Sequence, residues 1–125
     1  MSTDKITNNF PQVQQAMQRF VEAQPLVASM AIISNDGVLI GGFPKDADSE
    51  LSLGAMVSSA MAAAPTIVGE LNSTKLFSLV VLADKGGILF YQLADELVLS
   101  VKLKKPGKIG VLFGACQQFI KENLV

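Results

Sequence analysis

A segment without any charged side chain, from Leu51 to Gly69, constrains the fold of this chain more than any other feature. Its larger apolar residues recur every three or four positions, which is the spacing of one helix face. We expect this face to lie on a β-sheet, and its members are Leu53, Met56, Val57, Ala60, Met61, Ala64, Ile67 and Val68. The remaining positions hold small or hydroxyl-bearing residues: Ser52, Ala55, Ser58, Ser59, Ala62, Ala63 and Thr66.

A helix that lacks a charged face is usually buried on all sides. In a chain of 125 residues with three expected helices, another subunit is the natural cover for the second face. We therefore expect a dimer in which this helix packs against its own copy across a two-fold axis. The alternative is that alanine and serine simply fill a solvated helix.

The same helix is expected to run from about Glu50 to Leu71. Ser49 is a candidate N-cap, and Glu50 suits the positive end of the helix dipole. Pro65 removes one backbone hydrogen bond, which predicts a bend in the helix.

Amphipathic helices are also predicted near both ends of the chain. The first begins near Asn9 with Pro11 in its first turn, or is kinked at Pro11, and Pro25 ends it. Its apolar stripe is Ile6, Phe10, Val13, Met17, Phe20 and Val21. Residues 1–8 are expected to form a flexible N-terminal extension. The last helix runs from about Lys108 to Asn123, with the stripe Ile109, Leu112, Phe113, Cys116, Phe119 and Ile120.

Short apolar runs separated by turn residues predict the strands. Asn35-Asp36-Gly37 between two such runs is a strong hairpin signal. The expected strands are Leu26–Ser34, Val38–Phe43, Lys75–Ala83, Ile88–Leu93 and Leu97–Leu103. The order is α-β-β-α-β-β-β-α, and hairpin connections make the sheet mainly antiparallel. We expect an α+β fold in a single domain over residues 1–125, with one helix on one face of a five-stranded sheet and two on the other.

Composition excludes several classes of protein. Half of the residues are hydrophobic and the net charge is -1, so neither disorder nor a nucleic-acid partner is expected. The mean hydropathy of +0.41 indicates that part of the apolar surface lies in a subunit interface, although a large core would give the same value. With one cysteine, a polar amino terminus and no uninterrupted apolar run of membrane-spanning length, we expect a cytoplasmic protein without membrane insertion.

The inventory of chemically active residues argues against an enzyme. The chain has no histidine, so it lacks the usual general base and the commonest metal ligand, and we expect neither metal nor cofactor. Cys116 falls on an apolar helix stripe and is interpreted as a buried structural thiol. Asp36, Asp84 and Asp95 are interpreted as turn residues, and Lys85-Gly86-Gly87 lacks the frame of a phosphate-binding loop.

Four lysines cluster at the end of the last predicted strand: Lys102, Lys104, Lys105 and Lys108. They form a candidate basic patch for an acidic partner or a membrane surface. The alternative, which we favour, is a solvated loop with lysines that protect a sheet edge. Arg19 is the only arginine in the chain.

Two segments together with the start of the last helix resemble the roadblock family, the dynein-light-chain and bacterial GTPase-regulator group. The hairpin from Met30 to Gly42 looks like the family's opening hairpin, and the segment from Gly86 to Val101 is similar to its central meander. Ile109-Gly-Val-Leu-Phe113 resembles the start of its last helix. The similarity extends over roughly Phe10 to Leu124, and Pro11 departs from the family's pattern.

The resemblance implies a profilin-like, non-catalytic domain that forms a homodimer or pairs with a roadblock paralogue. Central helices and third-strand edges of two subunits would meet, and the dimer would bind a small Ras-like GTPase. The candidate interface residues are Ser52, Ala55, Met56, Ser59, Ala62, Ala63, Thr66, Leu76, Ser78 and Val80. A structural subunit of a larger assembly and a small-molecule sensor module remain alternatives.

Overall fold

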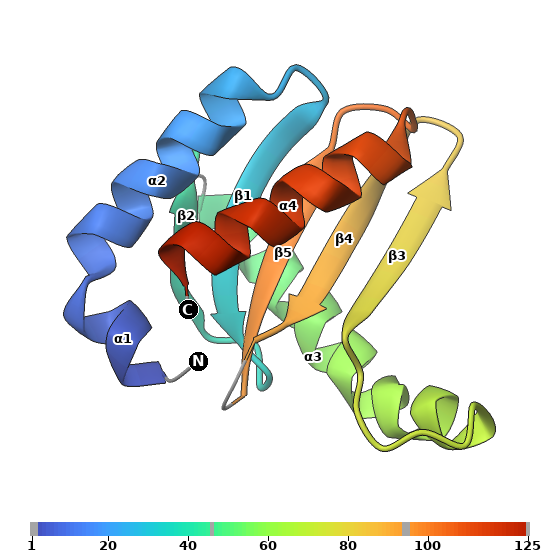
Figure 1. The fold of residues 1–125 in the computed structure, drawn as a ribbon. Helices are drawn as coiled ribbons and strands as arrows, with labels where there is room; N and C mark the ends of the chain where they lie inside the picture. Colours follow the sequence, from blue (N-terminus) through green and yellow to red (C-terminus); the bar gives the residue numbers. More distant parts are fainter. Residues whose placement is uncertain (1–2, 46, 94–95, 125) are drawn as a thin grey trace.

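The computed structural model describes residues 3–45, 47–93 and 96–124 (Figure 1). The strands form one five-stranded sheet in the order β2-β1-β5-β4-β3, and each adjacent pair is antiparallel. The predicted α+β class is therefore confirmed. The elements are α1 (Thr3–Asn8), α2 (Phe10–Ala23), β1 (Val27–Ser34), β2 (Leu39–Phe43), α3 (Ala47–Glu70), β3 (Ser78–Ala83), β4 (Gly86–Gln92), β5 (Leu97–Leu103) and α4 (Ile109–Asn123).

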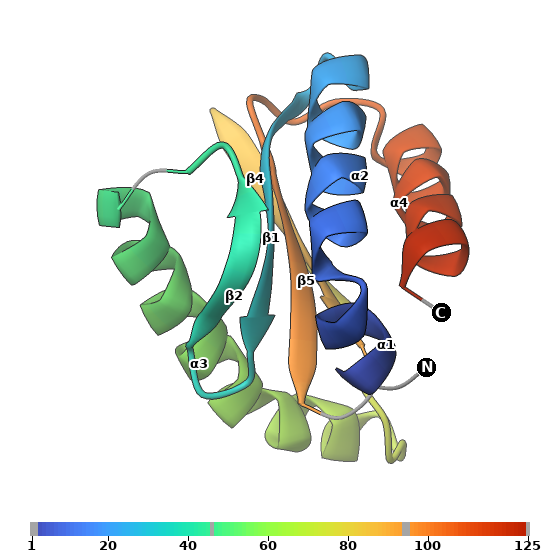
Figure 2. The ribbon, with the colours of Figure 1, turned by 90° about the vertical axis from the view of Figure 1, so that its left-hand side faces the viewer.

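Helices cover both faces of the sheet, as Figure 2 shows. α3 lies on one face, and α1, α2 and α4 lie on the other. The larger core lies under α2 and α4 and includes Met17, Ile32 and Leu99, none of which is exposed. The smaller core lies under α3 and joins Val57 to Ile33 and Val98. Strands buried on both faces explain why β1 and β5 read as continuous apolar runs.

The β1–β2 hairpin forms at the predicted turn. The Ser34 N–H donates to the Val38 carbonyl at 2.8 Å, and the Gly37 N–H donates to the Ser34 carbonyl at 2.9 Å. Gly37 has a φ of 94°, a backbone conformation that glycine adopts without strain. A register shift between Ile32 and Ile33 follows along the strand pair.

The amino-terminal segment differs in part from expectation. α2 begins at Phe10 with Pro11 in its first turn, as one of the two predicted arrangements required. Residues 1–8 were expected as a flexible extension, whereas the structure has the short helix α1 at Thr3–Asn8. Ile6 is only 1% exposed and belongs to the larger core. The buried side chain of Ile6 therefore holds α1 against the sheet. The polar residues around Ile6 gave no indication of this helix.

The central helix starts earlier than its predicted cap. α3 begins at Ala47, so Ser49 lies inside the helix and its prediction as N-cap was wrong. Pro65 lies within the second half of α3, and Figure 2 shows that the helix changes direction along its length. Asn72 has a φ of 52°, and the Ser73 N–H donates to the Val68 carbonyl at 3.0 Å. This left-handed residue ends the helix in the way that glycine or asparagine commonly does.

The meander has the predicted order of strands, but the bounds of its first two strands differ. β4 spans Gly86–Gln92 instead of the expected Ile88–Leu93. β3 begins at Ser78 instead of Lys75, and the Phe77 carbonyl accepts the first hydrogen bond from the Gln92 N–H at 3.0 Å. β5 has the predicted bounds. Asp95, interpreted as a turn residue, lies outside the described residues.

Candidate functional site

The face of α3 that points away from the sheet is exposed and almost free of charge. Val57, Ala64 and Val68 are at most 8% exposed, and Val57 packs against strand residues in the smaller core. Met56 and Ile67 are 42% and 43% exposed, so their assignment to the sheet-facing stripe was wrong. The uncharged residues that share this exposed face are Ser52, Ala55, Ser59, Ala62, Ala63 and Thr66.

A close approach of two glycines sets the position of α3. A Cβ on Gly54 would collide with the carbonyl oxygen of Gly37, which lies in the β1–β2 turn. A Cβ on Gly37 would in turn lie 2.7 Å from the carbonyl oxygen of Gly54. Because neither residue carries a side chain, the backbone of the helix rests directly on the hairpin. This contact fixes the position of α3, and therefore of its exposed face, relative to the sheet.

The second exposed apolar surface is the edge strand β3. One side of β3 pairs with β4, and no strand of the described chain pairs with its other side. Val80, Val81 and Leu82 are 39%, 49% and 49% exposed, and the strand contains no charged residue. Natural proteins usually protect such edges with charges, proline or a covering element. An edge of this kind is suited to pairing with another strand.

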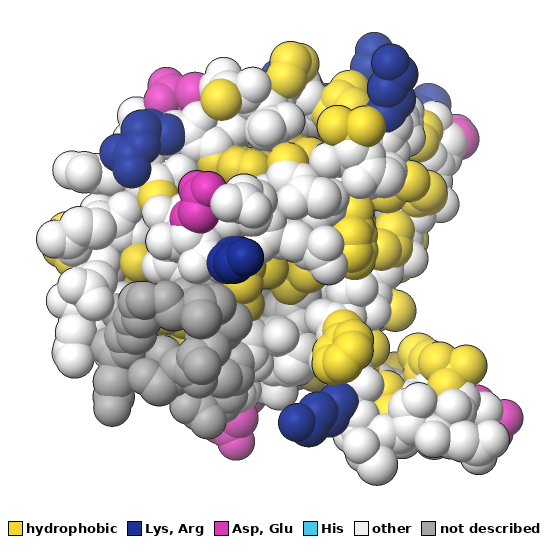
Figure 3. All heavy atoms as spheres, viewed as in Figure 1, with side chains coloured by type: hydrophobic (Ala, Val, Ile, Leu, Met, Phe, Trp, Pro, Cys, Tyr) yellow, Lys and Arg dark blue, Asp and Glu magenta, His cyan; other side chains and the backbone are white. Residues whose placement is uncertain are grey.

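Apolar exposure extends between these two surfaces. Leu71 and Phe77, on the connection from α3 to β3, are 69% and 80% exposed. Leu51, near the start of α3, is 79% exposed. Figure 3 shows hydrophobic side chains gathered along the side of the molecule where β3 lies. Of the predicted interface residues, Leu76 and Ser78 are half-buried.

The composition of α3 bears on the question of membrane insertion. By length and composition alone, Leu51–Glu70 could cross a membrane, with a mean hydropathy of 1.6. Only 28% of this span is buried, through the residues that pack on the sheet. Serine and glycine interrupt the apolar residues of this segment, so it contains no uninterrupted apolar run, whereas its average hydropathy is high. The absence of membrane insertion stays a prediction.

The four lysines of the candidate basic patch are all exposed, at the end of β5 and on the connection that follows it. Lys102 pairs with Ile88 across β5 and β4, which places it on the α3 side of the sheet. Lys104, Lys105 and Lys108 are exposed on the connection from β5 to α4. The helix α4 lies on the side of the sheet opposite to α3. Arg19 is exposed on α2, on that same side.

Cys116 is fully buried against Tyr91, as a structural thiol should be. Burial raises the pKa of the Cys116 thiol from 9.0 to about 11, and a hydrogen bond with Tyr91 offsets part of that rise. Burial likewise raises the pKa of Tyr91, and the neighbouring Cys116 adds to the shift. A thiol is reactive as its thiolate, so this environment keeps Cys116 unreactive at neutral pH. In the part of the chain that the structure describes, no three potential metal ligands cluster.

Comparison with known proteins identifies the family. The family model for the Roadblock/LC7 domain matches residues 13–103. The chain belongs to this family. Comparison with curated protein sequences gave no match.

Solved structures of roadblock proteins share the fold at low sequence identity. A Roadblock/LC7 domain from Streptomyces avermitilis is 18% identical, with a TM-score of 0.77 over 87% of this chain and 92% of that one. MglB from Myxococcus xanthus is 13% identical, with a TM-score of 0.78 over 90% and 92% of the two chains. The gliding protein MglB from Thermus thermophilus is 10% identical, with a TM-score of 0.75 over 88% and 84%. The predicted roadblock fold is thus confirmed.

Several exposed residues of the site were missed in the sequence. Leu51, Leu71 and Phe77 were not among the predicted interface residues, and neither were Val81 and Leu82. The run from Leu79 to Leu82 gave a usable signal, since it is apolar at successive positions and so presents apolar side chains on both faces of an edge strand. Leu71 and Phe77 gave none, because their exposure depends on where α3 ends.

Proposed function

We propose that this roadblock domain forms a two-fold homodimer through α3 and the edge of β3, and that the dimer regulates a partner protein in the cytoplasm. The observation that carries the proposal is the exposed, uncharged face of a helix whose span is only 28% buried. A second copy would supply the same face, as a two-fold interface requires. Removing both faces from water stabilises the pair through the hydrophobic effect.

The distribution of side-chain sizes along α3 suits an antiparallel helix pair. Two-fold symmetry across the middle of the helix makes two copies of α3 run in opposite directions. The small residues Ser59, Ala62 and Ala63 lie near the centre, where the backbones would approach closely. Leu51 and Leu71 are equally far from Met61 along the chain, and both are exposed. In an antiparallel pair, Leu51 of one copy would come beside Leu71 of the other.

The exposed β3 edge supports the same symmetry. Two antiparallel β3 strands related by a two-fold axis would pair their free backbone groups and extend the sheet across the dimer. Val81 points to the same face as α3, because it pairs with Ile88 of the smaller core. In the dimer, the second copy would therefore cover Val81 together with the exposed face of α3. One solved MglB structure is described as a tetrameric arrangement, so self-association occurs among proteins of similar fold.

A small Ras-like GTPase is the partner that we propose. Support comes from the family, whose bacterial members include the GTPase regulators that this sequence resembles, and from the structural similarity to MglB. The chain would act without a catalytic group of its own, since it offers no histidine and one arginine. Regulation would then work through the shape of the GTPase's own loops.

Crosslinking through an introduced cysteine tests the dimer. Under mild oxidation, we expect a Ser59→Cys variant to form disulfide-linked dimers, because Ser59 lies on the exposed face near the proposed axis. The native Cys116 is buried and unreactive, so any disulfide that links two subunits must form through the introduced cysteine. Non-reducing electrophoresis gives the readout.

A matched control places the cysteine elsewhere. Gln18→Cys sits on an exposed position of α2, on the other side of the sheet, and should stay monomeric on the same gel. Equal crosslinking of both variants would show random collision. Crosslinking of neither would remove the proposed interface.

A GTPase assay tests whether this chain supplies an arginine finger. With a purified Ras-like GTPase that binds the dimer, Arg19→Ala should keep the stimulated hydrolysis rate within about twofold of wild type, since a finger contributes about a thousandfold or more. A fall of that size in the variant, with binding intact, would contradict regulation without a catalytic residue.

A further inference from the structure

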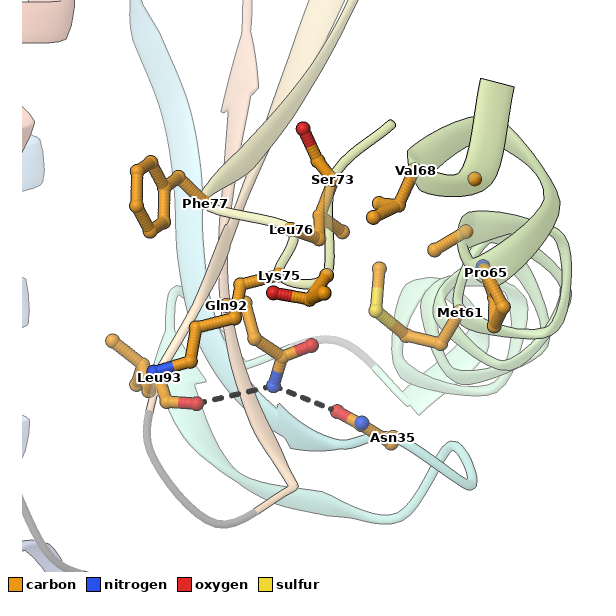
Figure 4. Close-up of a pocket in the computed structure, with 13 residues that line it drawn as sticks. Asn35, Met61, Pro65, Val68, Ser73, Lys75, Leu76, Phe77, Gln92 and Leu93 are labelled. Carbon is orange, nitrogen blue, oxygen red and sulfur yellow. Dashed lines mark hydrogen bonds between the residues drawn. The ribbon is translucent and has the colours of Figure 1, made fainter. Parts of the chain in front are cut away.

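A cavity of about 590 Å³ lies between the second half of α3 and the end of the sheet (Figure 4). Its apolar wall comes from separate segments: Met61, Pro65 and Val68 of α3, Leu76 and Phe77 before β3, and Leu93 after β4. These side chains face a common space because α3 diverges from the sheet toward its carboxyl end (Figure 2). The volume falls within the range of about 300–1,000 Å³ typical of small-molecule sites.

A fixed amide forms the polar part of the cavity. The Gln92 Nε2 donates to Asn35 Oδ1 at 3.2 Å, to the Leu93 carbonyl at 3.1 Å and to the Leu97 carbonyl at 2.9 Å. These bonds hold the side chain in one orientation, and Figure 4 shows its oxygen directed toward Met61. The Gln92 oxygen is thus a fixed acceptor, which cannot bond to an ionised carboxylate, so a negatively charged group of a ligand has to lie elsewhere in the cavity.

Lys75 is the one charged residue among the described residues that line the cavity. Its side chain is exposed and extends toward Leu93 (Figure 4). Ser73 and Thr74, which precede it, also line the cavity, and the Ser73 hydroxyl donates to the Leu71 carbonyl at 3.2 Å. A single cation next to an apolar wall attracts a ligand with one negative charge.

We propose that this cavity binds a small amphiphile with an apolar chain and one carboxylate. The chain lies along Met61, Val68 and Leu76, and the carboxylate lies at the rim near Lys75. This inference goes beyond the proposed function, which requires no ligand. Leu76 belongs to both the cavity and the proposed dimer interface, so the test must separate the two.

Methionine methyl groups provide the readout. The full chain with ¹³C-labelled methionine methyls is titrated with dodecanoate, below its critical micelle concentration, and followed by NMR. We expect a saturable shift of the Met61 signal, since Met61 lines the cavity. Met17 and Met30 lie in the core on the other face of the sheet and should not shift. Met56, on the outer face of α3, should not shift either.

Two variants and one control variant locate the ligand. Lys75→Gln should weaken dodecanoate binding about fivefold, the effect of losing one exposed ion pair. Lys85 is also exposed and lies in the turn after β3, away from the cavity. Lys85→Gln should therefore leave the affinity for dodecanoate unchanged. Ala64→Leu adds bulk inside the cavity and should abolish the Met61 shift, with unchanged Met17 and Met30 signals reporting an intact fold.

The outcomes distinguish this inference from the dimer. Ala63→Glu places a charge on the exposed face of α3 and should keep the chain monomeric. If the Met61 shift persists in this variant, the cavity binds its ligand whether or not the dimer exists. Absence of saturable binding in both wild type and Ala63→Glu would overturn the proposal and leave the dimer untouched. Equal shifts of all the methionines, or equal effects of the two lysine variants, would also overturn it, because binding would then be nonspecific.

Discussion

Replacing Gly54 with alanine is expected to lower the free energy of unfolding by about 2–3 kcal/mol, the cost of overpacking a rigid contact. The new methyl group would collide with the Gly37 carbonyl oxygen. Neither can rotate away, because the oxygen belongs to the backbone and the position of a Cβ is fixed by the backbone. α3 would have to shift off the hairpin, which would also disturb the packing of Val57 in the smaller core. Helix propensity alone predicts the opposite sign, because alanine favours helices over glycine.

Gly69→Ala is the matched control in the same helix. A Cβ at Gly69 meets nothing within 4 Å, so this substitution should stabilise the protein by about 0.5–1 kcal/mol. Chemical denaturation of both variants, followed by circular dichroism, gives the two free energies. Stabilisation by both substitutions would contradict the direct contact between α3 and the β1–β2 turn.

Substituting Ala63 with glutamate is expected to raise the dissociation constant of the dimer by at least about a hundredfold, the cost of an unpaired buried charge. Ala63 lies on the exposed face of α3 close to the proposed two-fold axis. Symmetry would therefore place two carboxylates near each other in an apolar interface. In the separated subunit each carboxylate is solvated, so the fold itself should be unaffected.

The control for charge is Gln18→Glu, which adds the same carboxylate on the exposed face of α2. Analytical ultracentrifugation should show wild-type association for Gln18→Glu and a monomer of 13.3 kDa for Ala63→Glu. Circular dichroism spectra should be identical for all three proteins. A dimer that tolerates glutamate at position 63 would place the interface elsewhere on the molecule.

Local signals in the sequence were sufficient for most of the fold. Asp36-Gly37 specified the hairpin because few other residues accept the backbone conformation of Gly37. The last strand was predicted with its observed bounds, since Leu97–Leu103 is bounded by turn residues on both sides. The ends of the helices were predicted less accurately than this last strand. α3 starts two residues before Ser49, and α1 forms where only Ile6 hinted at burial.

The candidate site was predictable only where composition is unusual. The uncharged stretch of α3 indicated an exposed face that needs cover, and the structure places its small residues on that face. The cavity beside Gln92 had no sequence signature. It depends on the course of α3 past Pro65 and on the path of residues 71–77, which bring together side chains far apart in the chain. Such tertiary arrangements are not encoded in any local pattern.

The mass of the wild-type chain in solution tests the dimer most directly. Light scattering after size-exclusion chromatography, repeated over a dilution series, should give twice the 13.3 kDa of one chain. The mass should fall toward that of the single chain only at the lowest concentrations. A mass of 13.3 kDa at every concentration would contradict the homodimer and leave the uncharged face of α3 to a different partner.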